Sequence, residues 1–235
     1  MSQTARNPAE SEGNLIVLVG VPLLADPRGA LYWPEQGLLA VADLHLEKGS
    51  SFAARGVLLP PYDSAATLAQ LARLIASYAP RCVVALGDSF HDGEGPARLG
   101  DSDREQLRAL QRGRDWVWLT GNHDPEPALD VGGLFHSALT VGAVTFRHEP
   151  MGVSGEIAGH LHPIARVTHR GRTVSRRCFA ADKTRMVMPA FGAFTGGLNI
   201  RNAAFCDLFG TLAFTAHLLG DSRIYSFGAK RCLPD

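Results

Sequence analysis

Five short segments carry side chains that could bind metal ions, and each follows an apolar run of the sequence. They are Asp43-Leu44-His45, Gly87-Asp88, Gly121-Asn122-His123-Asp124, His148 and Gly159-His160-Leu161-His162. Asp43 and His45 are two residues apart, as are His160 and His162, so on an extended chain the members of each pair point to one side. We expect the five segments to meet in one crevice, because open α/β sheets bind ligands at the carboxyl ends of their strands.

The residue types are those of a paired metal site. Carboxylate, amide oxygen and imidazole ligands suit Mn, Fe or Zn, and the missing thiolates argue against a structural zinc site. One carboxylate can bridge two ions about 4 Å apart, and such a pair activates water and stabilises an in-line displacement. Each segment alone has an ordinary alternative, such as a turn after a strand or a polar loop. Their joint occurrence after five apolar runs favours the metal site.

Alternating strands and helices must position these segments in the first half of the chain. Apolar runs at Leu38–Ala42, Arg81–Leu86 and Trp116–Leu119 predict strands. Residues 63–78, which Asp63 could cap, and residues 101–112 predict helices because their apolar side chains recur at helical spacing. This alternation indicates parallel βαβ units.

The second half of the chain contains short apolar runs that predict consecutive strands. The runs are Val141–Arg147, Ala165–His169, Thr173–Phe179, Met186–Ala190, Ala203–Leu208 and Thr211–His217, with turns at Arg170-Gly171 and Phe209-Gly210. They predict a second, antiparallel sheet. The stretch from Leu15 to Ala25 predicts a buried strand rather than a signal peptide, because acidic residues precede it and it contains Pro22. We expect a flexible N-terminus over residues 1–13 and a single domain over residues 14–235.

The composition does not indicate a strongly charged protein. The chain has 235 residues, 46% of them apolar, and 23 basic side chains balance 23 acidic ones. A nucleic-acid surface must therefore be a local patch. No apolar run reaches the ~18 residues of a membrane span, so no membrane partner is expected. The four cysteines form no C-x-x-C pair, and free cysteines fit a reducing cytoplasm.

Taken together, the five segments resemble the motifs of the calcineurin-like metallophosphoesterase superfamily over roughly residues 38–165. The resemblance implies an α/β fold, a four-layer α/β/β/α sandwich with two mixed sheets. It implies two metal sites, one of Asp43, His45, Asp88 and His162 and the other of Asp88, Asn122, His148 and His160, with Asp88 as the bridge. The single histidine is the weakest match, and His148 is favoured over His136 because it ends a predicted strand. His136, His169 and His217 are interpreted as structural or surface residues.

The same resemblance implies the chemistry of the site. His123 would protonate the leaving-group oxygen of a phosphate ester while a metal-bridging hydroxide attacks phosphorus. Asp124 would either orient His123 through a hydrogen bond or cap its own loop, and the residues leave both interpretations open.

A narrower resemblance concerns the PdeM-like, ligase-associated DNA-damage-response endonucleases. It rests on the sequence at residues 42–49, 59–61, 86–92 and 189–197. These bacterial phosphodiesterases are grouped with a DNA ligase, a helicase and an exonuclease, which the resemblance implies as functional partners. His91 is then a candidate substrate-facing residue, with a surface loop as the alternative. The glycines at 192, 196 and 197 either let the backbone approach a ligand or form a plain turn.

The leading interpretation is a phosphodiesterase that uses two divalent ions, Mn²⁺ before Fe or Zn, and acts as a DNA endonuclease in DNA repair. A small-molecule phosphatase or a cyclic-nucleotide phosphodiesterase is the alternative, since the same site serves both. A non-catalytic scaffold of the same fold should have lost ligands or the acid, and here none is missing.

A basic segment follows His162 directly. Between Pro163 and Arg185, arginine and lysine residues far outnumber the single acid, Asp182. We expect a hairpin in which Arg170, Arg172 and Arg176 bind a DNA phosphate backbone, which would make binding sensitive to salt. The alternative is a solvated hairpin with scattered charges.

Overall fold

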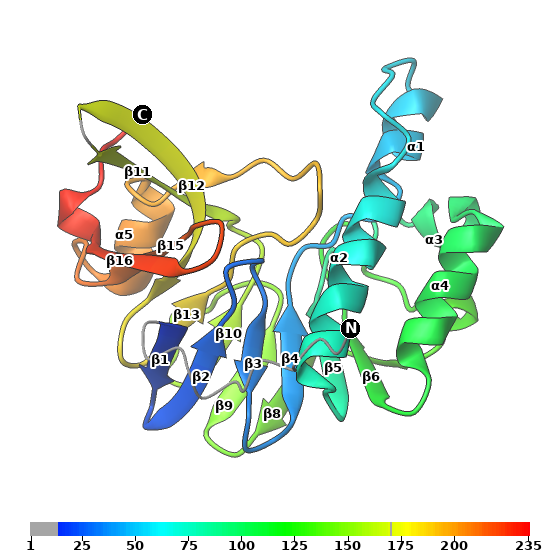
Figure 1. Ribbon diagram of the computed structural model, residues 1–235, viewed down its shortest axis with the longest axis horizontal. Coiled ribbons are helices and arrows are strands. Elements are labelled where there is room, and N and C mark those ends of the chain that lie inside the picture. Colours follow the sequence, from blue (N-terminus) through cyan, green and yellow to red (C-terminus); the bar gives the residue numbers. More distant parts are fainter. Residues whose placement is uncertain (1–13, 170) are drawn as a thin grey trace, which may run out of the picture.

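Two β-sheets face each other in this computed structural model, which describes residues 14–169 and 171–235 (Figure 1). The first sheet runs in the order β1 to β7: Leu15–Leu18, Val21–Ala25, Leu31–Trp33, Leu38–Val41, Cys82–Leu86, Asp115–Leu119 and Leu134–His136. Strands β4 to β7 are parallel and β1 to β4 are antiparallel, so the sheet is mixed. The flexible N-terminus expected over residues 1–13 lies outside the described residues.

The second sheet collects the strands of the second half in the order β14-β11-β12-β13-β10-β9-β8, with β15 and β16 attached to β12. Its strands are β8 Ala138–Val141, β9 Val144–Arg147, β10 Glu156–Ala158, β11 Pro163–His169, β12 Arg172–Ala181, β13 Met186–Val187, β14 Leu198–Asn199, β15 Thr215–Leu219 and β16 Ile224–Gly228. Strand β10 is parallel to both β9 and β13. The sheet is therefore mixed rather than purely antiparallel.

Helices cover the outer faces of the two sheets. They are α1 Lys48–Ala54, α2 Asp63–Tyr78, α3 Gly95–Arg98, α4 Asp101–Gln111 and α5 Ala203–Phe209, with short 3-10 turns η3 Leu129–Val131 and η4 Ala229–Arg231. Helices α2 and α4 lie beside the first sheet, and α5 lies beside the second (Figure 1). The layers are those of an α/β/β/α sandwich.

Alternation along the central strands explains the layers. Leu39 and Val83 pack on α2, whereas their neighbours Leu38 and Val84 point into the core between the sheets. Strand β4 is buried along its whole length, as expected for a parallel strand covered on both faces. The two sheets therefore share one apolar core.

Helix α2 has the predicted bounds, but Asp63 does not cap it. Tyr62 is the N-cap, and the carboxylate of Asp63 instead accepts a hydrogen bond of 3.0 Å from the backbone N–H of Gly49 in α1. The C-cap Ala79 has a left-handed backbone, and Pro80 follows it and cannot continue the helix. Asp63 thus fixes α1 to α2 rather than capping α2.

Three predicted strands differ in the structure. Leu15–Ala25 is a hairpin of β1 and β2, because Val19 and Gly20 both have positive φ, as a tight two-residue turn requires. Residues 138–147 likewise form the hairpin of β8 and β9. Residues 203–208 belong to helix α5, where Asn202 caps the backbone N–H of Ala204 at 3.0 Å and buried Phe205 and Phe209 fall one turn apart.

Candidate metal centre

The five expected segments follow strand ends in both sheets. Strands β4, β5 and β6 are parallel and lead to Asp43, Asp88 and Asn122, while the parallel strands β9 and β10 lead to His148 and His160. Their carboxyl ends lie on one side of the sandwich (Figure 1). The structure brings all five segments together, as the strand-end argument predicts.

One group of potential ligands comes from the ends of β4 and β10. Atoms of Asp43, His45 and His162 lie within 4.8 Å of one another. The Nε2 atom of His162 is 3.3 Å from Oδ1 of Asp43 and 3.3 Å from Nε2 of His45. Asp43 and His45 are buried, and the side chain of His162 is 19% exposed.

A second group combines Asp88 with His148 and His160, whose ligand atoms also lie within 4.8 Å of one another. The Nε2 atom of His148 is 3.4 Å from Oδ1 of Asp88 and 3.2 Å from Nδ1 of His160. The amide oxygen of Asn122 lies 2.9 Å from the same Nε2 atom. All four side chains therefore point to one position.

Asp88 lies between the two groups. Its Oδ2 atom is 3.8 Å from Nε2 of His45, and its Oδ1 atom is 3.4 Å from Nε2 of His148. The two oxygens of one buried carboxylate thus face different groups.

The backbone at these residues is left-handed, not extended. Asp43, His45, Asp88, His160 and His162 have φ between 43° and 67°. The members of the Asp43/His45 and His160/His162 pairs therefore do not converge through the extended alternation that the sequence suggests. Non-glycine residues adopt this conformation at a cost, and such strain concentrates at functional sites.

Gly121 and Gly192 let neighbouring segments approach the centre. A Cβ atom on Gly121 would overlap the backbone nitrogen and the Oδ1 atom of Asp88, and a Cβ atom on Gly192 would overlap the carbonyl oxygen of Leu44. The backbone N–H of Gly192 donates to the carbonyl of Asp43 at 3.1 Å. Gly192 therefore serves the packing of one chain segment on the segment that carries Asp43 and His45.

The donor set fits divalent cations. Nδ1 of His148 donates to the carbonyl oxygen of Leu86 at 2.9 Å, which leaves a lone pair on Nε2 facing the oxygens of Asp88 and Asn122. Such an outer hydrogen bond commonly orients a metal-binding histidine. Burial and the nearby rings of His162 and His123 lower the pKa of His45 to about 2, so its imidazole is neutral. Acceptor atoms that converge in this way need a cation between them.

His123 and His91 lie at the edge of the first group. The side chain of His123 is 39% exposed, and its Nε2 atom lies 3.9 Å from Oδ2 of Asp88. Its Nδ1 atom is 2.8 Å from the carbonyl oxygen of His91, and the two rings stack with centroids 5.2 Å apart. Nδ1 of His91 also lies 3.4 Å from Nδ1 of His45. His91 is therefore part of the cluster, which its position in a loop did not indicate.

Asp124 accepts hydrogen bonds from three backbone N–H groups. Its Oδ2 atom accepts hydrogen bonds from the backbone N–H groups of Ser89 and Phe90 at 2.8 and 3.1 Å, and its Oδ1 atom accepts one from Gly121 at 3.1 Å. Burial and the charge of Asp88 nevertheless raise the pKa of Asp124 to about 6. These contacts join Asp124 to the loop that carries Asp88 and to its own loop, and the carbonyl of His91 lies behind Nδ1 of His123.

The remaining histidines lie elsewhere. His136 ends β7 and is exposed, His169 is exposed at the end of β11, and Nδ1 of His217 lies 2.8 Å from the hydroxyl of Ser226. Among the described residues, none of these three belongs to a group of potential ligands.

Two of the three arginines expected to bind DNA, Arg172 and Arg176, are described by the structure, and both are exposed on β12. Arg170 lies outside the described residues. Arg172 and Arg176 alternate onto the face of β12 that carries buried Cys178, which packs in the α5 core. Arg177 points the other way and donates to the carbonyl of Ala190 at 2.8 Å. Arg177, which the sequence did not single out, thus supports the segment that carries Gly192.

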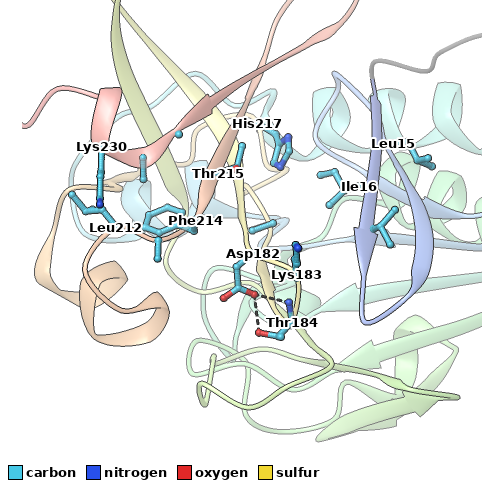
Figure 2. A pocket seen from close by; sticks show the side chains of 15 residues that line it. Leu15, Ile16, Asp182, Lys183, Thr184, Leu212, Phe214, Thr215, His217 and Lys230 are labelled. Atoms are coloured by element: carbon cyan, nitrogen blue, oxygen red, sulfur yellow. Dashed lines mark hydrogen bonds between the residues drawn. The ribbon is translucent and has the colours of Figure 1, made fainter.

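A cavity of about 770 Å³ lies away from the centre, between β1 and the strands β15 and β16 (Figure 2). Leu15, Lys183, Phe214 and His217 line it, and Asp182 at its base bonds to the backbone and hydroxyl of Thr184. None of the candidate metal ligands lines this cavity, so it is not the site of the proposed chemistry.

Comparisons with known proteins bear on the same residues. The model of the calcineurin-like phosphoesterase family matches residues 38–176, more than half of the chain. Among solved structures, the crystal structure of Pseudomonas putida nuclease MPE superposes with a TM-score of 0.70 at 28% sequence identity, covering 90% of this chain and 98% of that one. The curated proteins gave no match. Over the part of the chain that the structure describes, no helix has the length and hydropathy to cross a membrane.

Proposed function

Because the chain belongs to the calcineurin-like phosphoesterase family, we propose that this metal-dependent phosphoesterase is a two-metal phosphodiesterase that cuts DNA. The observation that carries the proposal is the position of Asp88, whose two oxygens face the two ligand groups at 3.8 and 3.4 Å. A single carboxylate placed in this way suits a pair of ions rather than one.

The residues divide into two ligand sets that share Asp88. Asp43, His45, Asp88 and His162 would hold one ion, and Asp88, Asn122, His148 and His160 would hold the other. Oxygen and imidazole donors without thiolate favour Mn²⁺, with Fe or Zn as substitutes. When bound, the ions supply activation of a water and neutralisation of charge on the phosphoryl group.

His123 is the proposed general acid. Its half-exposed ring can reach a substrate, and the hydrogen bond from Nδ1 to the carbonyl of His91 leaves Nε2 directed toward Asp88 and the space in front of the ligands. An acid at that position can protonate the oxygen of a departing nucleotide. The carbonyl and the stacked ring of His91 would keep His123 in this orientation.

The proposal of DNA as the substrate, and of a role in DNA repair beside a ligase, a helicase and an exonuclease, rests on two supports. One is the sequence resemblance at residues 42–49, 59–61, 86–92 and 189–197. The other is the structural likeness to Pseudomonas putida nuclease MPE. The ligand groups themselves suit any phosphate ester, so the substrate requires a direct test.

The test is hydrolysis by metal-stripped protein resupplied with Mn²⁺, Fe²⁺ or Zn²⁺. Plasmid DNA, bis-p-nitrophenyl phosphate, p-nitrophenyl phosphate and cyclic nucleotides would be offered to each form. We expect nicking of DNA and hydrolysis of the diester, with the highest rates in Mn²⁺. If the protein hydrolysed only monoesters or cyclic nucleotides, it would be a small-molecule phosphatase or a cyclic-nucleotide phosphodiesterase. If the metal-loaded protein hydrolysed none of the substrates, it would be a non-catalytic scaffold.

A further inference from the structure

Helix α1 and the segment that follows it stand out from the body of the protein on the side of the candidate metal centre (Figure 1). We call residues 48–62 the α1 arm. The arm contains Lys48 and Arg55 and no aspartate or glutamate. Its side chains therefore carry a net positive charge, whereas the formal net charge of the chain is zero.

The base of the arm contacts the centre through Phe52. The ring of Phe52 lies 5.5 Å from the ring of His91, which stacks at 5.2 Å on His123. The guanidinium of Arg55 lies 4.9 Å from the centroid of Phe52, and Nζ of Lys48 lies 5.8 Å from it. A continuous row of planar groups thus leads from Arg55 on the arm to the proposed general acid.

The rest of the arm exposes apolar side chains. Leu58 is 87% exposed, Tyr62 70% and Val57 50%. Phe194, which is 38% exposed, lies beside the arm because its carbonyl accepts a hydrogen bond of 2.9 Å from Nζ of Lys48. These large apolar side chains are therefore available for contact with a bound molecule.

We propose that the α1 arm binds the nucleic-acid strand on the leaving-group side of the scissile phosphate. Lys48 and Arg55 contact its phosphates, and Leu58 and Tyr62 contact its bases. This inference rests on the proposed nuclease function. It combines the features by which proteins hold nucleic-acid strands, which are cations for the backbone and apolar or aromatic side chains for the faces of the bases.

The side of the phosphate follows from the acid. His123 has to lie next to the oxygen that leaves, and the nearest surface beyond its ring is formed by His91 and Phe52. A nucleotide attached to that oxygen therefore continues along the arm. At the segment around Pro189–Gly192, the guanidinium of Arg177 donates to the carbonyl of Ala190 at 2.8 Å.

The test compares arm variants with matched exposed residues elsewhere. Arg55→Ala and Leu58→Ser are the arm variants, and Arg73→Ala on α2 and Leu134→Ser on β7 are the controls, since both control side chains are also exposed. The readout is the ratio of DNA cleavage to hydrolysis of bis-p-nitrophenyl phosphate. We expect each arm variant to lower this ratio by about fivefold or more, the size of a lost base or phosphate contact, and the controls to leave it unchanged.

A second measurement tests whether Leu58 contacts the bases of the strand. Wild-type protein should cut an ordinary strand faster than a strand with a run of abasic sites, and Leu58→Ser should lose most of that preference. A Leu58→Ser protein that keeps the full preference would overturn the assignment. So would light scattering that shows a wild-type dimer dissociating in Leu58→Ser, because the arm would then bind a second copy of the chain.

The two proposals fail in different ways. If the protein hydrolyses the diester but cuts no DNA, the proposed nuclease function is wrong, and so is the proposed role of the arm. If the protein cuts DNA but both arm variants behave like the controls, only the proposed role of the arm is wrong.

Discussion

The Nε2 atom of His148 lies 2.9 Å from the Oδ1 atom of Asn122. Because Nδ1 of His148 donates to the carbonyl of Leu86, Nε2 is the ring nitrogen left to act as a metal ligand, and it faces an amide oxygen, which is itself an acceptor. A ring nitrogen and an amide oxygen held at this distance can both bind one cation. The relationship separates His148 from His136, the alternative that the sequence left open.

His148→Ala should therefore remove one metal ion, and His136→Ala should remove none. The ligand group of Asp88 and His160 loses its third member in the first variant, whereas His136 lies at the exposed end of β7. Elemental analysis of purified protein gives the number of ions per chain, and diester hydrolysis should fall only in His148→Ala. Equal metal contents in the two variants would contradict the ligand assignment.

His123→Ala should retain its metal ions yet lose much of its rate on DNA. Loss of a general acid lowers the rate by about 10²–10⁴-fold. The loss should be much smaller for bis-p-nitrophenyl phosphate, because nitrophenolate leaves without a proton. The measurement is the pair of rates on the two substrates, with metal content determined on the same sample. A variant that has lost an ion would identify His123 as a ligand instead.

Gly121→Ala should destabilise the protein and weaken metal binding. The added methyl group would overlap the backbone nitrogen and Oδ1 of Asp88, and both are fixed parts of the centre. We expect a loss of about 2–3 kcal/mol in the free energy of unfolding, as for other severe steric substitutions. Gly93→Ala is the control, since a Cβ atom there has open space. Urea unfolding of both variants decides the outcome, and similar midpoints would argue against the close approach of Gly121 to Asp88.

Asp26→Asn should reduce stability at neutral pH and not in acid. Burial raises the pKa of Asp26, but hydrogen bonds and charge from Arg28 and a hydrogen bond from Tyr78 outweigh it, so the pKa lies below the ordinary value of 3.8. A carboxyl group with a lowered folded-state pKa stabilises the protein above its unfolded pKa, and this contribution disappears as the pH falls through the folded value.

The difference in unfolding free energy between wild type and Asp26→Asn should therefore be full at pH 7 and shrink as the pH falls below about 4. Urea unfolding over this range, with metal content as a check on the centre, measures it. A difference that stays constant with pH would show that the lost contacts, and not the charge of Asp26, stabilise the fold.

The order of strands and helices in the first half could be predicted from the sequence because its patterns are long and regular. Helix α2 has the expected bounds, since four turns of apolar side chains at helical spacing leave little ambiguity. Helix α5 was wrongly expected to be a strand. Its seven residues are mostly apolar, and in so short a run the periodicity cannot distinguish a buried helix from a strand.

The residues of the centre could also be found from their types, but their geometry could not. The left-handed backbone at Asp43 and His162 could not be predicted, because aspartate and histidine adopt it more often than most residues do but still only in a small minority of positions. The contacts of His91 could not be predicted either. Its place depends on a main-chain hydrogen bond to His123 and on ring stacking, and side-chain types do not report either contact.

The most direct test of the two-metal proposal is a titration of metal-free protein with Mn²⁺, followed by hydrolysis of bis-p-nitrophenyl phosphate. Asp88 faces both ligand groups, so neither ion alone completes the centre. The account predicts no turnover without metal and a rate that rises until two ions are bound per chain. Turnover by the metal-free protein, or a rate that is already maximal with one ion per chain, would contradict it.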